Sequence, residues 1–203
     1  MNLFVVGATG RTGRHVISQG ISRGHRLTAV VRKPQALNPH ANLQIVLGNP
    51  SRIQDLAKVL PGQDAVISCL GQKSRADAGL LQHAAAAMLD AMVRTGVRRY
   101  LLVSQGLLFP SRNPIVAILR IILARHIADS RAMERLVQAS AADWTIVRPP
   151  RLLDGESPRG YRTTVGVQPA GAWAMQRADL ATFLLDETEK HEHSRAIVGV
   201  TSG

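Results

Sequence analysis

The sequence has a single cysteine, Cys69, among its 203 residues, and aromatic residues make up only 3% of the chain. One cysteine excludes an internal disulfide framework and any metal site built from several cysteines. The shortage of aromatic residues argues against a stacking platform for single-stranded nucleic acid. The longest apolar stretch, PIVAILRIILA, contains Arg120 and is too short to cross a bilayer. We therefore expect no membrane span.

Acidic residues are also scarce. There are 14 Asp and Glu against 25 Lys and Arg, which gives a formal net charge of +11. Such an excess attracts phosphates, carboxylates, nucleic acid or anionic lipid. The arginines are scattered along the chain, so we expect no specific nucleic-acid partner. The first ten residues, MNLFVVGATG, lack the basic region and cleavage site of a signal peptide. Together with the single cysteine this predicts a cytoplasmic protein.

Short apolar runs rich in Val, Ile and Leu recur along the chain and predict strands buried on both faces. They lie at 3–6, 27–31, 43–47, 65–70, 100–103, 144–147 and 196–200. Segments with helical spacing lie between them, at 11–22, 51–60, 78–94, 115–140 and 178–188. Strands that alternate with helices indicate an α/β fold, a doubly wound Rossmann-type parallel sheet with helices on both faces. We expect a single domain over 1–203, with 149–171 forming a loop or small lobe over the substrate site.

The most informative motif is the glycine-rich segment GATGRTG at residues 7–13, where the first strand meets the first helix. Glycines there permit a tight turn and a close approach of a pyrophosphate, and the helix N-terminus offers free N–H groups. We expect Gly7, Thr9, Gly10, Arg11, Thr12 and Gly13 to hold the pyrophosphate and adjoining ribose of a dinucleotide.

The second predicted strand ends in Arg32 and Lys33, with no carboxylate beside them. An acidic residue at this point would bind the adenosine ribose of NAD, whereas arginine and lysine suit the 2′-phosphate of NADP. Arg11, inside the glycine turn, is a third candidate for the same phosphate. The sequence therefore predicts NADP(H) as the cofactor, the alternative being that these cations are only a solvated turn.

GATGRTG, VVRKP, GQDAVISCLG, VSQG and DWTIVRPP form an ordered set along the chain. Together they resemble the NAD(P)H-binding, NmrA-like group of atypical short-chain dehydrogenases/reductases, and most of all its flavin reductase/biliverdin-IXβ reductase branch. The resemblance implies further cofactor contacts at predicted strand ends, by Gly48, Asn49, Cys69, Leu70, Gly71, Ser104, Pro149 and Pro150. It also implies that Ser104 is the catalytic residue beside the nicotinamide. Relatives usually carry Asp at the position of Asn49.

The chain departs from ordinary short-chain dehydrogenases at the catalytic pair Tyr-x-x-x-Lys. Tyr100 is followed four residues later by Ser104, and Tyr161 by Val165. Relatives often have an Asp-Lys pair before the sixth strand, where this chain has Asp129 and Ser130. Without such a pair, proton transfer to a simple ketone is unsupported. A flat conjugated acceptor, such as a flavin, quinone or linear tetrapyrrole, can instead take its proton from solvent.

Three further groups of residues have alternative interpretations. Arg151, Arg159 and Arg162 follow the sixth strand and either bind an anionic substrate or are surface charge. His191 and His193, with Glu192 between them, could bind a metal, but we expect a solvated helix end and no metal. The apolar stripe Ile115, Ile118, Leu119 and Ile122 predicts a core-facing helix, with a pocket wall, dimer face or membrane-surface contact as alternatives.

The sequence thus supports two functions. The first is an NADPH-dependent oxidoreductase that passes hydride to a conjugated, possibly anionic small molecule. The second is a redox-sensing regulator that binds NADP(H) without turnover and docks a protein partner. The oligomeric state stays open, with a monomer favoured.

Overall fold

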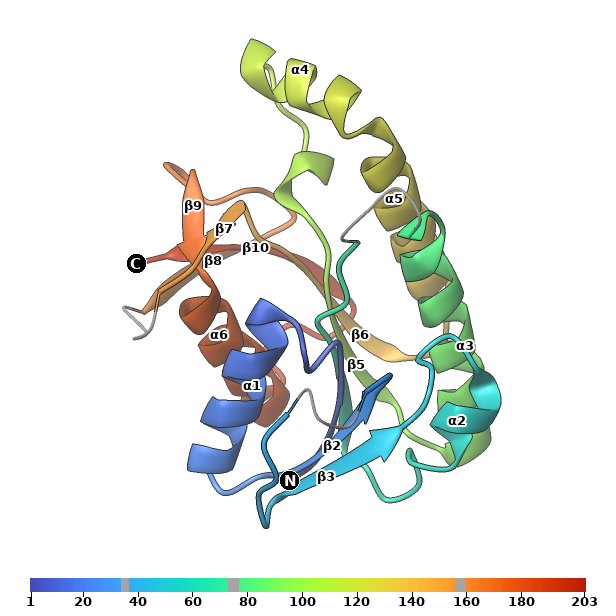
Figure 1. The fold of residues 1–203 in the computed structure, drawn as a ribbon. Coiled ribbons are helices and arrows are strands. Elements are labelled where there is room, and N and C mark those ends of the chain that lie inside the picture. The colour runs from blue at the N-terminus through green and yellow to red at the C-terminus, as the bar shows by residue number, and fades with distance from the viewer. Residues whose placement is uncertain (34–36, 73–76, 156–159) are drawn as a thin grey trace.

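A computed structural model of the chain describes residues 1–33, 37–72, 77–155 and 160–203. Strands and helices alternate through the first half (Figure 1): β1 (Asn2–Val6), α1 (Arg11–Ser22), β2 (Arg26–Val31), β3 (Leu43–Leu47), α2 (Ile53–Ala57), β4 (Ala65–Ser68), α3 (Leu80–Thr95) and β5 (Arg99–Val103). The second half has the 3-10 helix η3 (Gly106–Leu108), then α4 (Pro114–Ile122), α5 (Ala124–Ala139), β6 (Asp143–Arg148), β7 (Arg151–Leu153), β8 (Tyr161–Val165), β9 (Ala174–Gln176), α6 (Arg177–Lys190) and β10 (Ala196–Ser202).

Within these described ranges, eight strands form one sheet in the order β3-β2-β1-β4-β5-β6-β10-β8. Neighbouring strands are parallel except β8, which pairs with β10 in the antiparallel sense. The order reverses direction at β1, as in a doubly wound sheet. The predicted Rossmann-type α/β fold is therefore confirmed.

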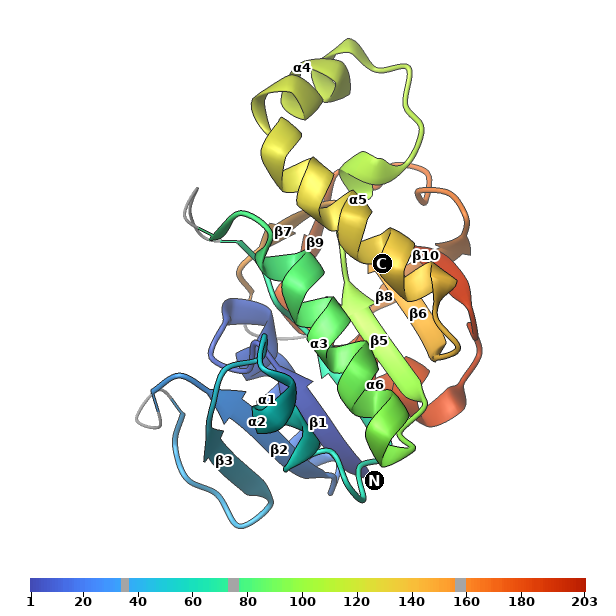
Figure 2. The ribbon, with the colours of Figure 1, turned by 90° about the vertical axis from the view of Figure 1, so that its right-hand side faces the viewer.

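The sheet is buried between two layers of helices. Helices α1 and α6 pack together on one face, and α2, α3 and α5 pack on the other (Figures 1 and 2). Along β1, Leu3 and Val5 belong to the core on the α1/α6 face, whereas Phe4 and Val6 belong to the core on the α3/α5 face. Because both faces are covered, successive residues of a strand are all apolar, which explains the continuous apolar runs.

The segment 115–140, predicted as one long or broken helix, is broken at Leu123 into α4 and α5. Asn113 caps α4 through its Oδ1 atom, which accepts a hydrogen bond of 2.8 Å from the Ile115 N–H, and Pro114 occupies the first turn. None of the residues of α4 is buried, and the helix projects beyond the sheet (Figure 2). The expectation of a core-facing stripe on this helix is therefore wrong.

A second local expectation also fails. Ser51 and Gln54 suggest a capping box that starts a helix at residue 51, but α2 begins at Ile53 and no side chain caps it. The N–H of Ser51 instead donates to the Asn49 side-chain oxygen at 3.0 Å. This local turn at Asn49 competes with the helix for the Ser51 backbone.

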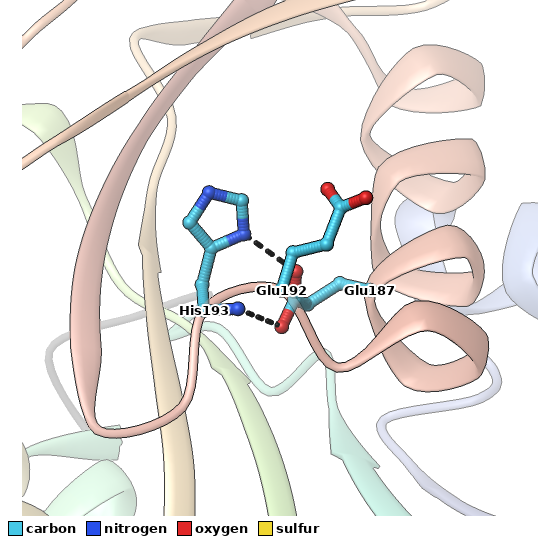
Figure 3. Close-up of side chains that lie close together, drawn as sticks. All are labelled: Glu187, Glu192 and His193. Atoms are coloured by element: carbon cyan, nitrogen blue, oxygen red, sulfur yellow. Dashed lines mark hydrogen bonds and ion pairs between the residues drawn. The ribbon is translucent and has the colours of Figure 1, made fainter.

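At the end of the sheet where β5 and β6 begin, the buried carboxylate of Glu187 connects α6 to Arg99 of β5 and Thr145 of β6. Glu187 accepts hydrogen bonds from the Arg99 guanidinium (2.6 Å), the His193 N–H (2.9 Å) and the His193 ring Nδ1 (2.6 Å). Figure 3 shows the two contacts with His193 as dashed lines, beside Glu192. Glu187, Glu192 and His193 are near enough to share a cation, but the Arg99 guanidinium already balances the Glu187 charge. Glu187, Arg99 and His193 therefore serve as a structural anchor, and Glu192 is exposed beside them.

Replacing Glu187 with Ala would leave Arg99 buried with one carboxylate, that of Asp143 at 3.3 Å, and with two long contacts to the backbone carbonyls of Asp143 and residue 187. We expect the free energy of unfolding in urea to fall by about 3 kcal/mol, as for other buried pairs that lose one partner. Glu192→Ala is the matched control, because Glu192 is exposed and should change stability by less than about 0.5 kcal/mol. Equal stability of the two variants would show that Glu187 is no anchor.

Candidate functional site

The glycine turn between β1 and α1 is packed against the end of β4. Gly7 has a φ of +75°, and a Cβ atom there would lie 2.7 Å from the Cys69 carbonyl oxygen. A Cβ at Gly13 would lie 2.2 Å from the Gly7 carbonyl oxygen. Both separations are too short for any side chain. These two glycines therefore let the backbone of the turn approach β4 and the first turn of α1.

Gly10 has a different role in this turn. Its φ is −74°, which any residue can adopt, and a Cβ would meet only the Gly7 oxygen, at 3.1 Å. Gly10 is the N-cap of α1, and neither a side-chain cap nor an acidic residue occupies the first turn of this helix. The first N–H groups of a helix have no partner within the helix and carry its positive dipole end. The turn is therefore a cradle that fits the diphosphate of a dinucleotide.

A cavity of about 230 Å³ lies directly over this turn. Eight residues expected to bind the cofactor line it, namely Gly7, Thr9, Gly10, Arg32, Asn49, Cys69, Leu70 and Gly71. Four other predicted contacts, Thr12, Gly13, Lys33 and Gly48, do not line the cavity, although Lys33 and Gly48 directly adjoin Arg32 and Asn49 in the sequence. Asp77 also lines the cavity, and no sequence motif marks it, because it follows no predicted strand.

The end of β2 presents the cations expected to bind the 2′-phosphate. Arg32 and Lys33 are both exposed, and Arg32 lines the cavity. On the next strand, the Asn49 N–H donates to Asp55 at 2.9 Å, which fixes the β3–α2 turn at the cavity wall. An anionic group that binds at this cavity would therefore meet the positive charge of Arg32 beside a turn that a hydrogen bond holds in place.

Arg11 has a partner elsewhere. Its guanidinium lies 2.8 Å from Asp154, and the same carboxylate lies 2.7 Å from Arg177. The two arginines keep the pKa of Asp154 below its usual value. Arg11 does not line the first cavity, so its contact with a 2′-phosphate stays a prediction.

The thiol and the phenols are poor candidates for acid–base chemistry. Burial raises the pKa of the Cys69 thiol to about 12, so it stays protonated at neutral pH. Tyr100 is buried, which raises its pKa, and it bonds to Ser68. The Tyr161 hydroxyl donates to Asp186 at 2.6 Å, and that carboxylate also raises the phenol pKa. These are the chain's two tyrosines, and neither lines the cavities described in this section.

Ser104 follows β5, between the ends of β4 and β6 in the sheet. Its N–H donates to the Val147 carbonyl at 2.7 Å, which joins the two strand ends. Its hydroxyl oxygen is buried and makes no hydrogen bond with any of the residues that the structure describes. A buried hydroxyl without a partner is costly, so the unmet hydrogen bond marks Ser104 as a candidate ligand contact, although Ser104 lines neither the first cavity nor the second cavity described below.

The positions of the missing Asp-Lys pair have structural partners. The buried Asp129 carboxylate accepts from the N–H groups of Leu81 and Gln82, both at 3.1 Å, and so caps α3. The Ser130 hydroxyl accepts a 2.7 Å hydrogen bond from the Gln105 side-chain amide. Ser130 therefore orients Gln105 and supplies no titrating group.

A second, larger cavity of about 600 Å³ lies beside the ends of β5 and β6. Its walls include the predicted residues Pro149, Pro150 and Arg151. Ile115 and Leu119 also line it, so part of the apolar stripe of α4 is a pocket wall, which was one of the alternatives for this stripe. Gln168, Pro169 and Gly171 belong to the segment 149–171 that was expected over the substrate site. Sequence reasoning missed other wall residues, namely Gln105, Gly106, Leu107, Val116, Leu123, Ala172 and Trp173.

The three arginines expected to bind substrate are not gathered together. Arg151 lines the second cavity, whereas Arg162 is exposed on β8 and lines neither cavity. Arg159 lies outside the described residues. Of the two arginines that the structure describes, Arg151 lies next to the candidate acceptor pocket and Arg162 does not.

A model of the NAD(P)H-binding family matches residues 7–191, and the chain belongs to this family. It is 28% identical over 208 residues to the uncharacterized sugar epimerase YhfK of Bacillus subtilis, covering 97% of this chain and 92% of that protein. The resemblance inferred from the motifs is thus confirmed at the level of the NAD(P)H-binding family.

Solved structures share the fold. A short-chain dehydrogenase/reductase from Veillonella parvula in complex with NADP has a TM-score of 0.81 at 18% identity, covering 99% of this chain and 94% of that one. A Streptococcus pneumoniae protein provisionally described as an NADH-flavin reductase has a TM-score of 0.82 at 24% identity, covering 100% of both chains. Among the described residues, the structure contains no helix long and apolar enough to span a membrane.

Gly10→Val tests the cradle directly. We expect the variant to fold, because its backbone angles suit any residue, but to bind NADPH at least 100-fold more weakly, about 2.7 kcal/mol, by calorimetry. A branched side chain at the N-cap would occupy the anion position. Gly13→Ala is the contrasting variant, since its Cβ meets backbone, and its melting temperature should fall. Unchanged NADPH affinity of a folded Gly10→Val variant would contradict this reading of the cradle.

Proposed function

We propose that the protein is an NADPH-dependent reductase that transfers hydride to a flat conjugated acceptor. The observation that carries the proposal is the order of the two cavities along the sheet. The first lies over the ends of β2, β1 and β4, and the second over the ends of β5 and β6. Because β4 and β5 are neighbours, Ser104 stands at the boundary where a nicotinamide and an acceptor would meet.

The choice of NADPH over NADH depends on charge at the end of β2. Arg32 lines the first cavity and Lys33 is exposed beside it. A 2′-phosphate would gain charge-assisted hydrogen bonds from these two residues, whereas the bare ribose of NADH would gain none. This argument supports NADPH as the preferred reductant.

The acceptor class follows from the side chains at the boundary. Ser104 has an unmet hydrogen bond and Gln105 is held by Ser130, but neither side chain is a proton donor that titrates near neutral pH, and both tyrosines are engaged elsewhere. A conjugated ring system spreads the charge of the added hydride and takes a proton from water. The apolar walls of the second cavity, with Trp173 and Pro150, suit such a flat molecule.

The contribution of the protein would then be positional. NADPH supplies the hydride when bound, and the cradle and the second cavity hold the two partners face to face. The fold shared with the Streptococcus pneumoniae protein provisionally described as an NADH-flavin reductase is compatible with a flavin as the acceptor.

Cofactor preference is the first test. NADPH should bind at least tenfold more tightly than NADH, about 1.4 kcal/mol. The double change Arg32→Ala with Lys33→Ala should remove most of that gap, because it weakens NADPH and spares NADH. Calorimetric titration of both nucleotides into both proteins measures the four affinities. Equal affinities in the unaltered protein would refute the preference.

Turnover is the second test. NADPH oxidation is followed with FMN, FAD, quinones and biliverdin as acceptors. We expect turnover with at least one of them. Tight NADPH binding with no turnover on any acceptor would support the redox-sensing regulator instead.

Ser104→Ala tests the boundary residue. We expect kcat to fall by roughly 3- to 100-fold, about 0.7–2.7 kcal/mol, because the hydroxyl orients a partner and does not ionise. NADPH affinity should change little, and the pH profile should lack a steep limb. A loss greater than about ten-thousandfold with binding intact would show that Ser104 takes part in the chemistry. Unchanged kcat would show that it has no role.

A further inference from the structure

The outer side of the second cavity bears an exposed apolar surface. Ile115, Ile118, Ile121 and Ile122 of α4, together with Trp173, are each more than half exposed, and Trp173 reaches 72%. Ile115 and Trp173 also line the second cavity, so α4 and the segment before β9 meet at this cavity. We name these five residues the apolar rim. Contiguous apolar surfaces of this kind mark interaction sites in folded proteins.

The helix that carries most of the rim is held in place by several specific contacts. Asn113 caps its first turn, and Pro114 fixes its start. The Arg120 guanidinium donates to the carbonyl oxygens of Leu107 and Phe109. These contacts hold α4 away from the sheet, at the end of the molecule that projects in Figures 1 and 2. The fold therefore presents the isoleucines outward in a defined position.

The charged residues that flank α4 along the sequence have one sign. The sequence contains no acidic residue between Asp90 and Asp129, and Asp129 is buried. Arg112 and Arg125 are exposed before and after α4, and the whole chain carries +11. An apolar helix flanked by exposed arginines is complementary to an anionic lipid surface, which attracts cations and accepts apolar side chains.

We propose that the apolar rim docks on an anionic lipid bilayer, with the mouth of the second cavity against the membrane. The docking stands on the exposed side chains and the charge around them. Its consequence rests on the proposed function: a lipophilic acceptor of the quinone class would enter the cavity from the bilayer. A second copy of the chain is a poorer occupant, because a symmetric contact through α4 would bring the arginines of both copies together.

The chain contains its own reporter for the test. Of its two tryptophans, Trp173 is exposed on the rim and Trp144 is buried at 7% exposure. Adding vesicles of equal parts phosphatidylglycerol and phosphatidylcholine should shift the tryptophan emission to the blue and sediment the protein. Vesicles of phosphatidylcholine alone should do neither. Trp173→Phe should lose the emission shift while still sedimenting.

Variants of α4 test the residues. Ile118→Ser with Ile122→Ser should weaken vesicle binding by roughly tenfold or more. Val93→Ser is the matched control, because Val93 is an equally exposed apolar residue on α3 and should bind as the unaltered protein does. Arg112→Gln and Arg125→Gln should each weaken binding by about fivefold, and salt should weaken it further.

The outcomes separate docking from the proposed function. With FMN as a soluble acceptor and no vesicles, the Ile118/Ile122 variant should oxidise NADPH at the unaltered rate. Vesicle binding without turnover on any acceptor would leave docking in place and remove the reductase. Absence of binding to the anionic vesicles at low salt would overturn the docking proposal. It would also fall if sedimentation velocity showed a dimer that the Ile118/Ile122 variant abolishes.

Discussion

The close approach of the β1–α1 turn to the end of β4 is the constraint on which the site depends. The backbone at Gly7 lies so near the Cys69 carbonyl that no side chain fits between them, and the same holds between Gly13 and Gly7. This approach directs the N-terminus of α1 at the space above β1 and β4. The pairing of β1 with β2 and of β2 with β3 places the ends of these strands around the same space, so the turn and the sheet register together set the walls of the nucleotide cavity.

The order of the sheet then determines what can happen beside that cavity. Since β5 and β6 follow β4 in the sheet, the second cavity lies beside strand ends that neighbour those of the first, and Ser104 follows the strand between β4 and β6. Neither Tyr100 nor Tyr161 lines either cavity, and Ser130 stands where relatives often have lysine. Because the serines at these positions offer hydrogen bonds but do not titrate near neutral pH, they favour positioning of the reactants over acid–base chemistry. Two residues of the apolar rim, Ile115 and Trp173, line the same cavity and are exposed to solvent.

Sequence reasoning succeeded where the signal is local or where one physical rule applies along the whole chain. The parallel sheet followed from apolar strands buried on both faces, and the cradle followed from a short glycine segment. It failed where distant segments compete. Arg11 forms an ion pair with Asp154, which is 143 residues away in the sequence. No sequence pattern near Arg11 predicts that partner. The stripe on α4 has a helical period, but the period alone does not say whether its apolar face meets the core, a cavity or solvent. The small sheet pairs β7 with β9, two short strands that are far apart in the sequence, so no local pattern indicates the pairing.

The central claim is that nicotinamide and acceptor meet at the boundary of the two cavities. The most direct measurement mixes the NADPH-loaded protein with an acceptor under anaerobic conditions and follows the absorbance of the reduced nicotinamide in a single turnover. Transfer across this boundary predicts a rapid decay that slows when the transferred hydrogen is replaced by deuterium. Bound NADPH whose absorbance never decays, with any flavin, quinone or tetrapyrrole, would contradict it.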